Sequence, residues 1–298
     1  MRIYLYLSVK GNDLESLQAC VQVANYLSLN KDLLSLKNAG YEFEHSYALY
    51  EFEADDYANL KAKITDAVIK RLFNFDVMLL QQIPSLERPG VLLMDMDMTS
   101  VQIEGIDEIA RCLNVYDKVA AITHEAMNGK LDFAGSLRKR VALLKDGSSK
   151  VLDKVKAIMT ETSGLDHLIY GLKKNNWKVG IASGGFVQLI CVLEEKYGLD
   201  LVRANSLEIC DGKFTGAVEG EIIDAVKKKE ALFDLLKKAA APLSQSVVLG
   251  DGANDLQMIN AAALGIAYHA KPKVEEKALA CLNYSDLSAV LLLLQSAS

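Results

Sequence analysis

Three short runs of apolar residues, each ending in a polar cluster, constrain the fold of this chain most strongly. The runs, with the residues that end them, are 91–94 with Asp95, 179–182 with Ser183, and 247–249 with Gly250 and Asp251. Continuous apolar runs of this length are typical of strands that are buried on both faces. Because a segment of helical periodicity follows each run, we predict an α/β core built on a doubly wound parallel sheet. In such sheets ligands bind beyond the carboxyl ends of the strands, where all three polar clusters fall.

The first part of the chain follows a different pattern. Apolar and polar residues alternate at 3–7 and 48–52, as in half-buried strands. Apolar residues recur at helical spacing at 14–24 and 57–68, and an apolar segment at 73–80 indicates a last strand. This order predicts a small α+β module of the ferredoxin-like or ACT-like type, with one strand that the pattern does not place. Pro84 and the Arg88-Pro89-Gly90 stretch mark its end. We therefore predict a module over residues 1–84 and an α/β core over residues 85–298.

The segment between the first two apolar runs is too long for a single crossover connection. Apolar residues recur at helical spacing in four stretches, 106–113, 119–126, 137–144 and 151–158. We interpret residues 105–163 as a small helical cap, inserted into the core over the active edge of the sheet. Further along, apolar residues on both sides of Asp211-Gly212 predict a β-hairpin.

Composition and charge narrow the class of protein. Of the 298 residues, 51% are hydrophobic and 24% are charged, which is typical of a soluble protein with a substantial core. The 39 acidic and 33 basic residues leave a net charge of −6, which argues against a large nucleic-acid footprint. The N-terminus is too polar for a secretion signal, and the late apolar run at 291–294 falls far short of the ~20 residues that cross a bilayer. The five cysteines are scattered, as in a reducing compartment. We expect a cytoplasmic protein without nucleic-acid or membrane partners.

The sharpest local feature is Asp95-Met96-Asp97-Met98-Thr99, directly after the first run. If the chain turns into a loop there, Asp95 is placed to act as a nucleophile and Asp97 as an acid and base, while the backbone carbonyl of Asp97 helps to hold a cation. A solvated loop, or a helix N-cap formed by Asp97 or Thr99, explains the same residues equally well.

A second cluster, Gly250-Asp251-Gly252-Ala253-Asn254-Asp255, follows the third run. It does not fit a dinucleotide-binding loop, because Asp255 occupies the place of the third glycine and would repel a pyrophosphate. Two carboxylates at a strand end suit a hard cation such as Mg²⁺, which takes oxygen ligands. The alternative is an acidic turn without a ligand.

The remaining two clusters carry weaker signals. Ser183-Gly184-Gly185 offers a hydroxyl beside glycine N–H groups, as in a phosphate cradle, although a glycine-rich turn between strand and helix is the more common reason for such a sequence. The triplet Lys227-Lys228-Lys229 is typical of a solvated helix face, yet one of its lysines is placed to neutralise a bound phosphate.

The order of these clusters, and longer segments around them, resemble a known family. The segments are MDMDMTSVQIEGIDEIA, MNGKLDFAGSLRKRVALLK, IASGGF, DGKFTG and GDGANDLQMI. Over roughly residues 84–285 they are similar to the bacterial phosphoserine phosphatases of the haloacid dehalogenase superfamily. The resemblance implies a haloacid dehalogenase-like α/β fold and a magnesium-dependent phosphatase. Its expected reaction is the hydrolysis of O-phospho-L-serine to L-serine and phosphate, the last step of serine biosynthesis.

The resemblance also implies roles for single residues at the sheet edge. Asp95 matches the nucleophile that becomes an aspartyl phosphate, and Asp97 matches the general acid and base. Asp95, the backbone carbonyl of Asp97 and Asp251 match the Mg²⁺ ligands, with Asp255 and Thr99 in support. The phosphate- and substrate-binding groups are matched by Ser183, the backbone of Gly184, Lys228 and Asn254, with Gly185 in support.

In the predicted cap the resemblance points to groups that hold the rest of the substrate. Glu104 matches the acid that meets the ammonium, Arg140 matches the fork that binds the carboxylate, and Met127 and Phe133 match apolar wall positions. Without the resemblance, residues 138–140 are better explained as a solvated helix face and Phe133 as a core residue.

Some features stay open at this level. Met98 stands where relatives often carry a small residue, and we expect its side chain to pack under the loop. The N-terminal module carries no motif that names an effector, and a homodimer is compatible with the sequence. Transfer of the phosphoryl group to another alcohol, or a different small phosphomonoester, would use the same catalytic residues. In a further alternative the module acts as a ligand-binding or partner-binding regulator.

Overall fold

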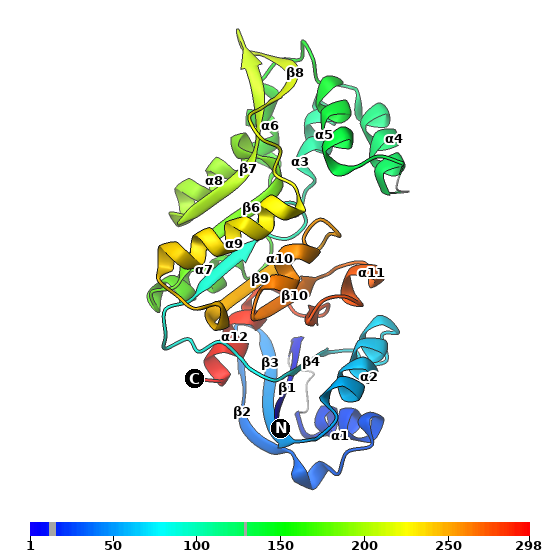
Figure 1. Ribbon diagram of the computed structural model, residues 1–298, viewed down its shortest axis with the longest axis vertical. Coiled ribbons are helices and arrows are strands. Elements are labelled where there is room, and N and C mark those ends of the chain that lie inside the picture. The colour runs from blue at the N-terminus through cyan, green and yellow to red at the C-terminus, as the bar shows by residue number, and fades with distance from the viewer. Residues whose placement is uncertain (12–15, 128–129) are drawn as a thin grey trace.

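The computed structural model describes residues 1–11, 16–127 and 130–298, and it leaves out the side chains of residues 16, 17 and 127. Within these ranges the chain forms two sheets, which lie at opposite sides of the C-terminal helix in Figure 1. No helix in the described ranges is long and apolar enough to cross a membrane.

The N-terminal module has the β–α–β–β–α–β order of a ferredoxin-like fold. Its elements are β1 (Arg2–Lys10), α1 (Ser16–Leu27), a short 3₁₀ helix (Lys31–Leu33), β2 (Ser35–Glu42), β3 (His45–Glu53), α2 (Tyr57–Ile69) and β4 (Asp76–Leu80). The strands form an antiparallel sheet in the order β2-β3-β1-β4. The predicted α+β module is confirmed, and the strand that the pattern left unplaced is β2.

The burial of these strands explains what the sequence pattern missed. Almost all of β2 is exposed, so its residues carry no alternation of apolar and polar side chains. Strand β1 was expected to be half buried, but it is buried on both faces. Leu5 packs toward α1 and α2, whereas Tyr6, which the alternation placed on the polar side, is 0% exposed and packs in the main core beside the C-terminal helix.

The central sheet has the order β11-β10-β9-β5-β6-β7-β8 and is parallel except for the last pair. Its strands are β5 (Val91–Met94), β6 (Lys178–Phe186), β7 (Leu201–Cys210), β8 (Lys213–Glu219), β9 (Ser246–Gly250), β10 (Leu264–Tyr268) and β11 (Ala280–Leu282). Its helices are α7 (Leu165–Lys174), α8 (Val187–Tyr197), α9 (Ala225–Ala239), α10 (Leu256–Ala261), α11 (Pro272–Glu275) and α12 (Ser288–Ser296), and a 3₁₀ helix (Leu243–Gln245) precedes β9.

Alternating side chains of the strands anchor helices on both faces of this sheet. Leu92 and Met94 belong to the cluster that includes α7, α8 and α12, and Val91 and Leu93 belong to the cluster that includes α9 and α10. A strand that is buried on both faces is apolar at every position, so the continuous run at 91–94 is explained. The core is the predicted doubly wound parallel sheet.

Helices α3 (Gly105–Cys112), α4 (Tyr116–Met127), α5 (Phe133–Ala142) and α6 (Val151–Ile158) lie between β5 and β6 in the chain. In Figure 1 they stand above the carboxyl end of the sheet, and α5 packs against the predicted hairpin, formed by β7 and β8. Two linkers join these helices to the sheet: a first linker, residues 95–104, and a second linker, residues 159–164. They pair through the Gln102 N–H to the Thr160 carbonyl (2.8 Å) and the Thr162 N–H to the Ser100 carbonyl (3.0 Å). The domain boundary at residue 84 and the cap boundaries at residues 105 and 163 stay predictions.

The N-terminal module contacts the core through the loop between β11 and α12. The carboxylate of Asp76 is buried and accepts hydrogen bonds from the backbone N–H groups of Asn283, Tyr284 and Ser285. Burial raises the pKa of Asp76 to about 6, although these donors act against the shift. The Tyr6 hydroxyl donates to the Ala289 carbonyl at 3.0 Å. These hydrogen bonds connect β4 to the loop after β11, and β1 to the start of α12.

A second set of polar contacts connects the module to the cap. Asp286 accepts from the Ser163 hydroxyl at 2.6 Å and from the Lys10 ammonium at 3.3 Å, and its N–H donates to Nε2 of the buried His45 at 3.1 Å. Ser163 lies in the second linker. The module is therefore hydrogen-bonded, through Asp286, to the segment that leads out of the cap.

We predict that Asp76→Ala lowers the free energy of unfolding by about 2–4 kcal/mol, because three buried N–H groups lose their acceptor. Urea denaturation of the variant and the wild type measures the difference. Asp66→Ala is the control: Asp66 is half exposed and pairs with Lys70 on the same helix, so its loss costs less than about 1 kcal/mol. Equal effects of the two substitutions would contradict the role of Asp76.

Candidate active site

The four polar clusters of the sequence meet at the carboxyl edge of the central sheet. Strand β5 lies between β9 and β6, so Asp95 at the end of β5 has Asp251 on one side and Ser183 on the other. The Asp95 N–H continues the sheet by donating to the Leu249 carbonyl at 3.0 Å. Lys228 comes from the first turn of α9, which Asp224 caps by accepting from the N–H groups of Val226 and Lys227.

Lys228 is fully buried between two carboxylates. Its Nζ lies 2.8 Å from Oδ1 of Asp95 and 2.7 Å from Oδ1 of Asp255. Burial acts to lower the pKa of Lys228, but the negative charges of Asp255 and Asp95 outweigh it and raise the pKa above its ordinary value. Lys228 is therefore charged, and it is the middle lysine of the triplet that reaches the site.

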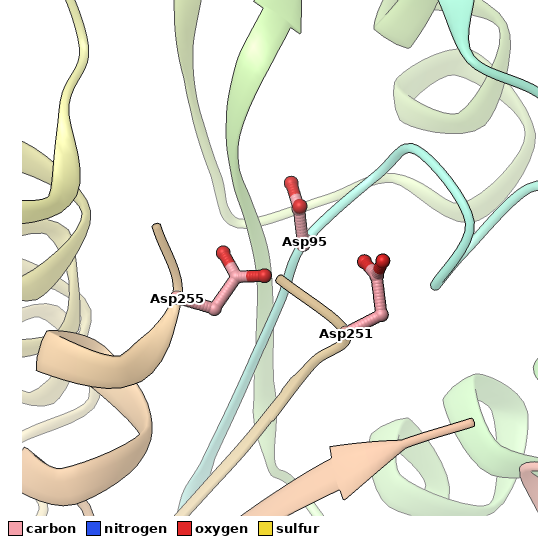
Figure 2. A group of neighbouring side chains, drawn as sticks. All are labelled: Asp95, Asp251 and Asp255. Carbon is pink, nitrogen blue, oxygen red and sulfur yellow. The ribbon is translucent and has the colours of Figure 1, made fainter. Parts of the chain in front are cut away.

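Asp95, Asp251 and Asp255 form an acidic cluster in which carboxylate oxygens from all three lie within 4.8 Å of one another. Figure 2 shows the three side chains converging from the end of β5, the loop after β9 and the start of α10. Burial, and next the charge of Asp95, raise the pKa values of Asp251 and Asp255 to about 7. The one ammonium of Lys228 thus leaves negative charge uncompensated. The cluster has the oxygen donors and the charge that a hard divalent cation requires.

The loops around the cluster hold its carboxylates in place. The hydroxyl of the buried Thr99 donates to Oδ1 of Asp251 at 3.1 Å, and the Gly252 N–H donates to Oδ2 of Asp255 at 2.9 Å. A Cβ atom at Gly250 would lie 2.5 Å from Cβ of Asp255. The glycine at this strand end is therefore needed for close packing between β9 and α10.

Asp97 lies beside the cluster rather than in it. Its Oδ1 accepts from the Gly105 N–H at 2.9 Å, and a Cβ atom at Gly185 would lie 2.6 Å from its Oδ2. Burial, followed by the charges of Glu104 and Asp95, raises the pKa of Asp97 well above the ordinary value. A raised pKa favours the protonated carboxyl group, which is the form that can donate a proton. The predicted use of its backbone carbonyl as a metal ligand stays a prediction.

Ser183 and the two glycines do not follow the strand, as the sequence suggested, but lie within β6. The pairing of β6 with β7 shifts register between Ala182 and Phe186, so the chain bulges there. At the bulge the Gly185 N–H donates to the buried Ser183 hydroxyl at 2.8 Å, and the Gly184 carbonyl accepts from Nδ2 of Asn205 at 2.8 Å. A bulge redirects a strand without ending it, which places Ser183 next to Asp97.

The cap reaches this edge through α5. A Cβ atom at Gly184 would lie 2.8 Å from the Phe133 ring and 3.8 Å from Nδ2 of Asn254. Phe133 and Asn254 therefore flank Gly184, and α5 of the cap lies against the sheet edge at this point. Phe133 is not only a core residue of the cap, because its ring contacts the sheet edge.

Arg140 also faces the site from α5. Burial lowers its pKa, and the negative charges of Asp107, Glu104 and Asp97 act against that shift. Its buried Nε has no hydrogen-bond partner among the described residues. Glu104 is the N-cap residue of α3, but its side chain makes no capping hydrogen bond. Desolvation, followed by the charge of Asp107, raises its pKa. Glu104 and Arg140 thus lie close enough for the charge of each to affect the pKa of the other, and Phe133 is on the same helix as Arg140. The side chain of Met127 lies outside the described residues.

A cavity of about 370 Å³ opens beside Asp251 and Glu104. Its other lining residues are Met98, Gln102, Tyr268, His269 and Lys271. Met98 does not pack under the loop as expected: it has a φ of 54° and is 39% exposed. Tyr268, His269 and Lys271 were not singled out from the sequence, because they belong to no motif. Their position at the end of a buried strand was the available signal.

Comparison with known proteins agrees with this arrangement. The haloacid dehalogenase-like hydrolase family model matches residues 90–263. A phosphoserine phosphatase of Vibrio cholerae serotype O1 is 43% identical over 232 residues, which are 78% of this chain and 70% of that protein.

Solved structures extend the similarity to the fold. The structure of a probable phosphoserine phosphatase from Vibrio cholerae, in its unliganded form, matches with a TM-score of 0.81 at 35% identity. The match covers 99% of this chain and 87% of that protein's chain. A phospho-aspartyl intermediate analogue of phosphoserine phosphatase has a TM-score of 0.65 at 43% identity, over 69% of this chain and 98% of its own. On its sequence and on its fold, the chain belongs to the haloacid dehalogenase-like hydrolases.

Proposed function

We propose that this protein is a magnesium-dependent phosphatase that hydrolyses O-phospho-L-serine to L-serine and phosphate. The observation that carries the proposal is the buried Asp95 carboxylate, which lies against the Lys228 ammonium and inside an acidic cluster suited to a cation. The similarity to phosphoserine phosphatases over most of the chain supports the choice of substrate.

In the first step the Asp95 carboxylate attacks phosphorus, and the bond between phosphorus and the serine oxygen breaks. The leaving oxygen takes the proton of Asp97, which the raised pKa of that carboxyl keeps available. Lys228 and the Ser183 hydroxyl lie where they offset charge on the phosphoryl oxygens. The products of this step are free serine and an aspartyl phosphate on Asp95.

In the second step Asp97, now ionised, takes a proton from water as the water oxygen attacks phosphorus. The bond between phosphorus and Asp95 breaks, which releases phosphate and restores both carboxyl groups. A relative captured with an analogue of a phospho-aspartyl intermediate supports this sequence. When bound, Mg²⁺ would offset the negative charge of the phosphate and the carboxylates. Asp95, Asp251 and the Asp97 carbonyl would hold it, with Asp255 and Thr99 in support.

The cap supplies the groups for the rest of the substrate. Arg140 brings a partly buried guanidinium that has no ion pair among the described residues, as a binding group for a carboxylate requires. Glu104 brings a carboxylate of opposite sign for the ammonium, and Phe133 closes the apolar wall. The cytoplasmic location, and a homodimer as the assembly, stay predictions from the sequence.

Phosphate release from a panel of phosphomonoesters tests the proposal directly. Wild-type protein with Mg²⁺ is expected to prefer phosphoserine, and chelation of the metal is expected to abolish release. Asp95→Asn should lose at least about a thousandfold in kcat, because the amide is not a nucleophile. Asp211→Asn, in the exposed turn between β7 and β8, is the matched control and should keep full activity. The absence of metal-dependent release from phosphoserine would reject the proposal.

Arg140→Ala is expected to lower kcat/KM for phosphoserine about 100-fold, since a charge-assisted pair with the carboxylate is lost. Phosphoethanolamine, which lacks that carboxylate, should lose less than about threefold. Arg138→Ala removes an exposed arginine of the same helix and should change neither substrate. Equal losses on both substrates would mean that Arg140 supports only the cap.

Gly184→Ala is expected to lower kcat/KM by about tenfold or more, because the added methyl group would meet the Phe133 ring and keep the cap from closing. Steady-state kinetics on phosphoserine measure the loss. If the clash is the cause, adding Phe133→Ala to Gly184→Ala causes no further loss. Fully additive losses in the double variant would contradict this explanation.

A further inference from the structure

Helix α5 holds two buried polar atoms that have no hydrogen-bond partner among the described residues: Oγ of Ser136 and Nε of Arg140. The two residues are four apart, so they lie one turn from each other on the same side of the helix. Arg140 belongs to the proposed substrate site. Ser136 has been given no role, and it is 2% exposed.

Helix geometry places Ser136 between two residues that face the site. Phe133, three residues before it, contacts Gly184, and Arg140, four residues after it, is close to Glu104 and Asp97. Residues three and four apart are neighbours on a helix surface, with Cβ atoms about 5–6 Å from each other. Arg138 and Lys139, by contrast, are exposed. Ser136 therefore shares the face of α5 that covers the sheet edge.

The Ser136 hydroxyl makes no hydrogen bond within α5. A serine inside a helix commonly donates to the carbonyl four residues earlier. Here the Asp132 carbonyl accepts the Ser136 N–H at 3.0 Å, and the Asp132 carboxylate accepts the Gly135 N–H at 2.7 Å. The Ser136 hydroxyl is therefore left without a hydrogen bond among the described residues, and it is buried one helical turn from the Arg140 Nε, which also has none there. Buried polar groups are almost always hydrogen-bonded, so both atoms are open to a partner that the described residues do not supply.

We propose that the Ser136 hydroxyl donates a hydrogen bond to the substrate carboxylate next to Arg140, and that it is a specificity-determining residue for phosphomonoesters carrying an α-carboxylate. The inference rests on the proposed function, and it adds to that function a second donor on the same helix face. Arg140 supplies the charge and Ser136 an uncharged donor one turn away, so together they recognise a carboxylate at a defined position. An ester without the carboxylate gains nothing from Ser136.

The substitution Ser136→Ala separates the two parts of the substrate. It is expected to lower kcat/KM for phosphoserine about tenfold, the cost of one hydrogen bond to a charged group. For phosphoethanolamine and p-nitrophenyl phosphate, both without a carboxylate, the change should stay below about twofold. Ser136→Thr keeps the hydroxyl and should recover part of the loss. Lys139→Ala, at an exposed position of the same helix, is the matched control.

Two further measurements distinguish recognition from a structural role. If Ser136 and Arg140 bind the same carboxylate, Ser136→Ala has little further effect in an Arg140→Ala background. Because the hydroxyl has no hydrogen-bond partner among the described residues, the ligand-free Ser136→Ala variant should melt within about 2 °C of the wild type.

The outcomes separate the two proposals. A wild-type protein inactive on phosphoserine overturns the proposed function and this inference with it. An active wild type whose Ser136→Ala variant is unchanged, or loses equally on all three substrates, overturns the inference alone. A fall in melting temperature above about 4 °C would do the same, since it would show that the hydroxyl stabilises the cap itself.

Discussion

The buried ammonium of Lys228 is the interaction on which the rest of this site depends. An apolar sheet does not accept several carboxylates at one edge unless positive charge is brought to them. Lys228 provides that charge from α9, whose apolar residues Leu232 and Leu235 anchor the helix to the sheet. It contacts Asp95 and Asp255 together, so β5 and α10 are both positioned against one helix. This single positive charge does not balance the three carboxylates of the cluster, which therefore has the excess negative charge that a divalent cation requires.

The cap and the core carry different parts of the proposed site. In the proposed mechanism the core carries the groups that act on the phosphoryl group, and these are held by strand ends, a bulge and the first turn of a helix. The cap carries Phe133, Ser136 and Arg140 on one face of α5, with Glu104 at the start of α3. Because the cap is connected by two short linkers, its face is set over the edge as a unit. Change in the cap can therefore alter which ester is accepted without touching the reacting groups.

The sequence predicted the α/β core well, because strands buried on both faces are apolar throughout and their ends carry the polar clusters. It left β2 unplaced, since an exposed edge strand has no hydrophobic period. Ser183 was expected after its strand, but a bulge is a matter of strand pairing and leaves no mark in a local pattern. Tyr268 and Lys271 reach the cavity only because β10 ends there. Ser136 is distinguished by a missing partner, which no sequence pattern can reveal.

The N-terminal module docks on residues near the C-terminal end of the described chain, which bears on the order of docking and synthesis. Asp76, Tyr6 and His45 are bonded to residues 283–289, which belong to the loop after β11 and the start of α12. A ribosome makes the module early and these residues only after nearly all of the core. The groups that hold the module on the core are therefore present only after the last strand and helix have been made. Docking of the module in this arrangement cannot precede synthesis of β11 and the start of α12.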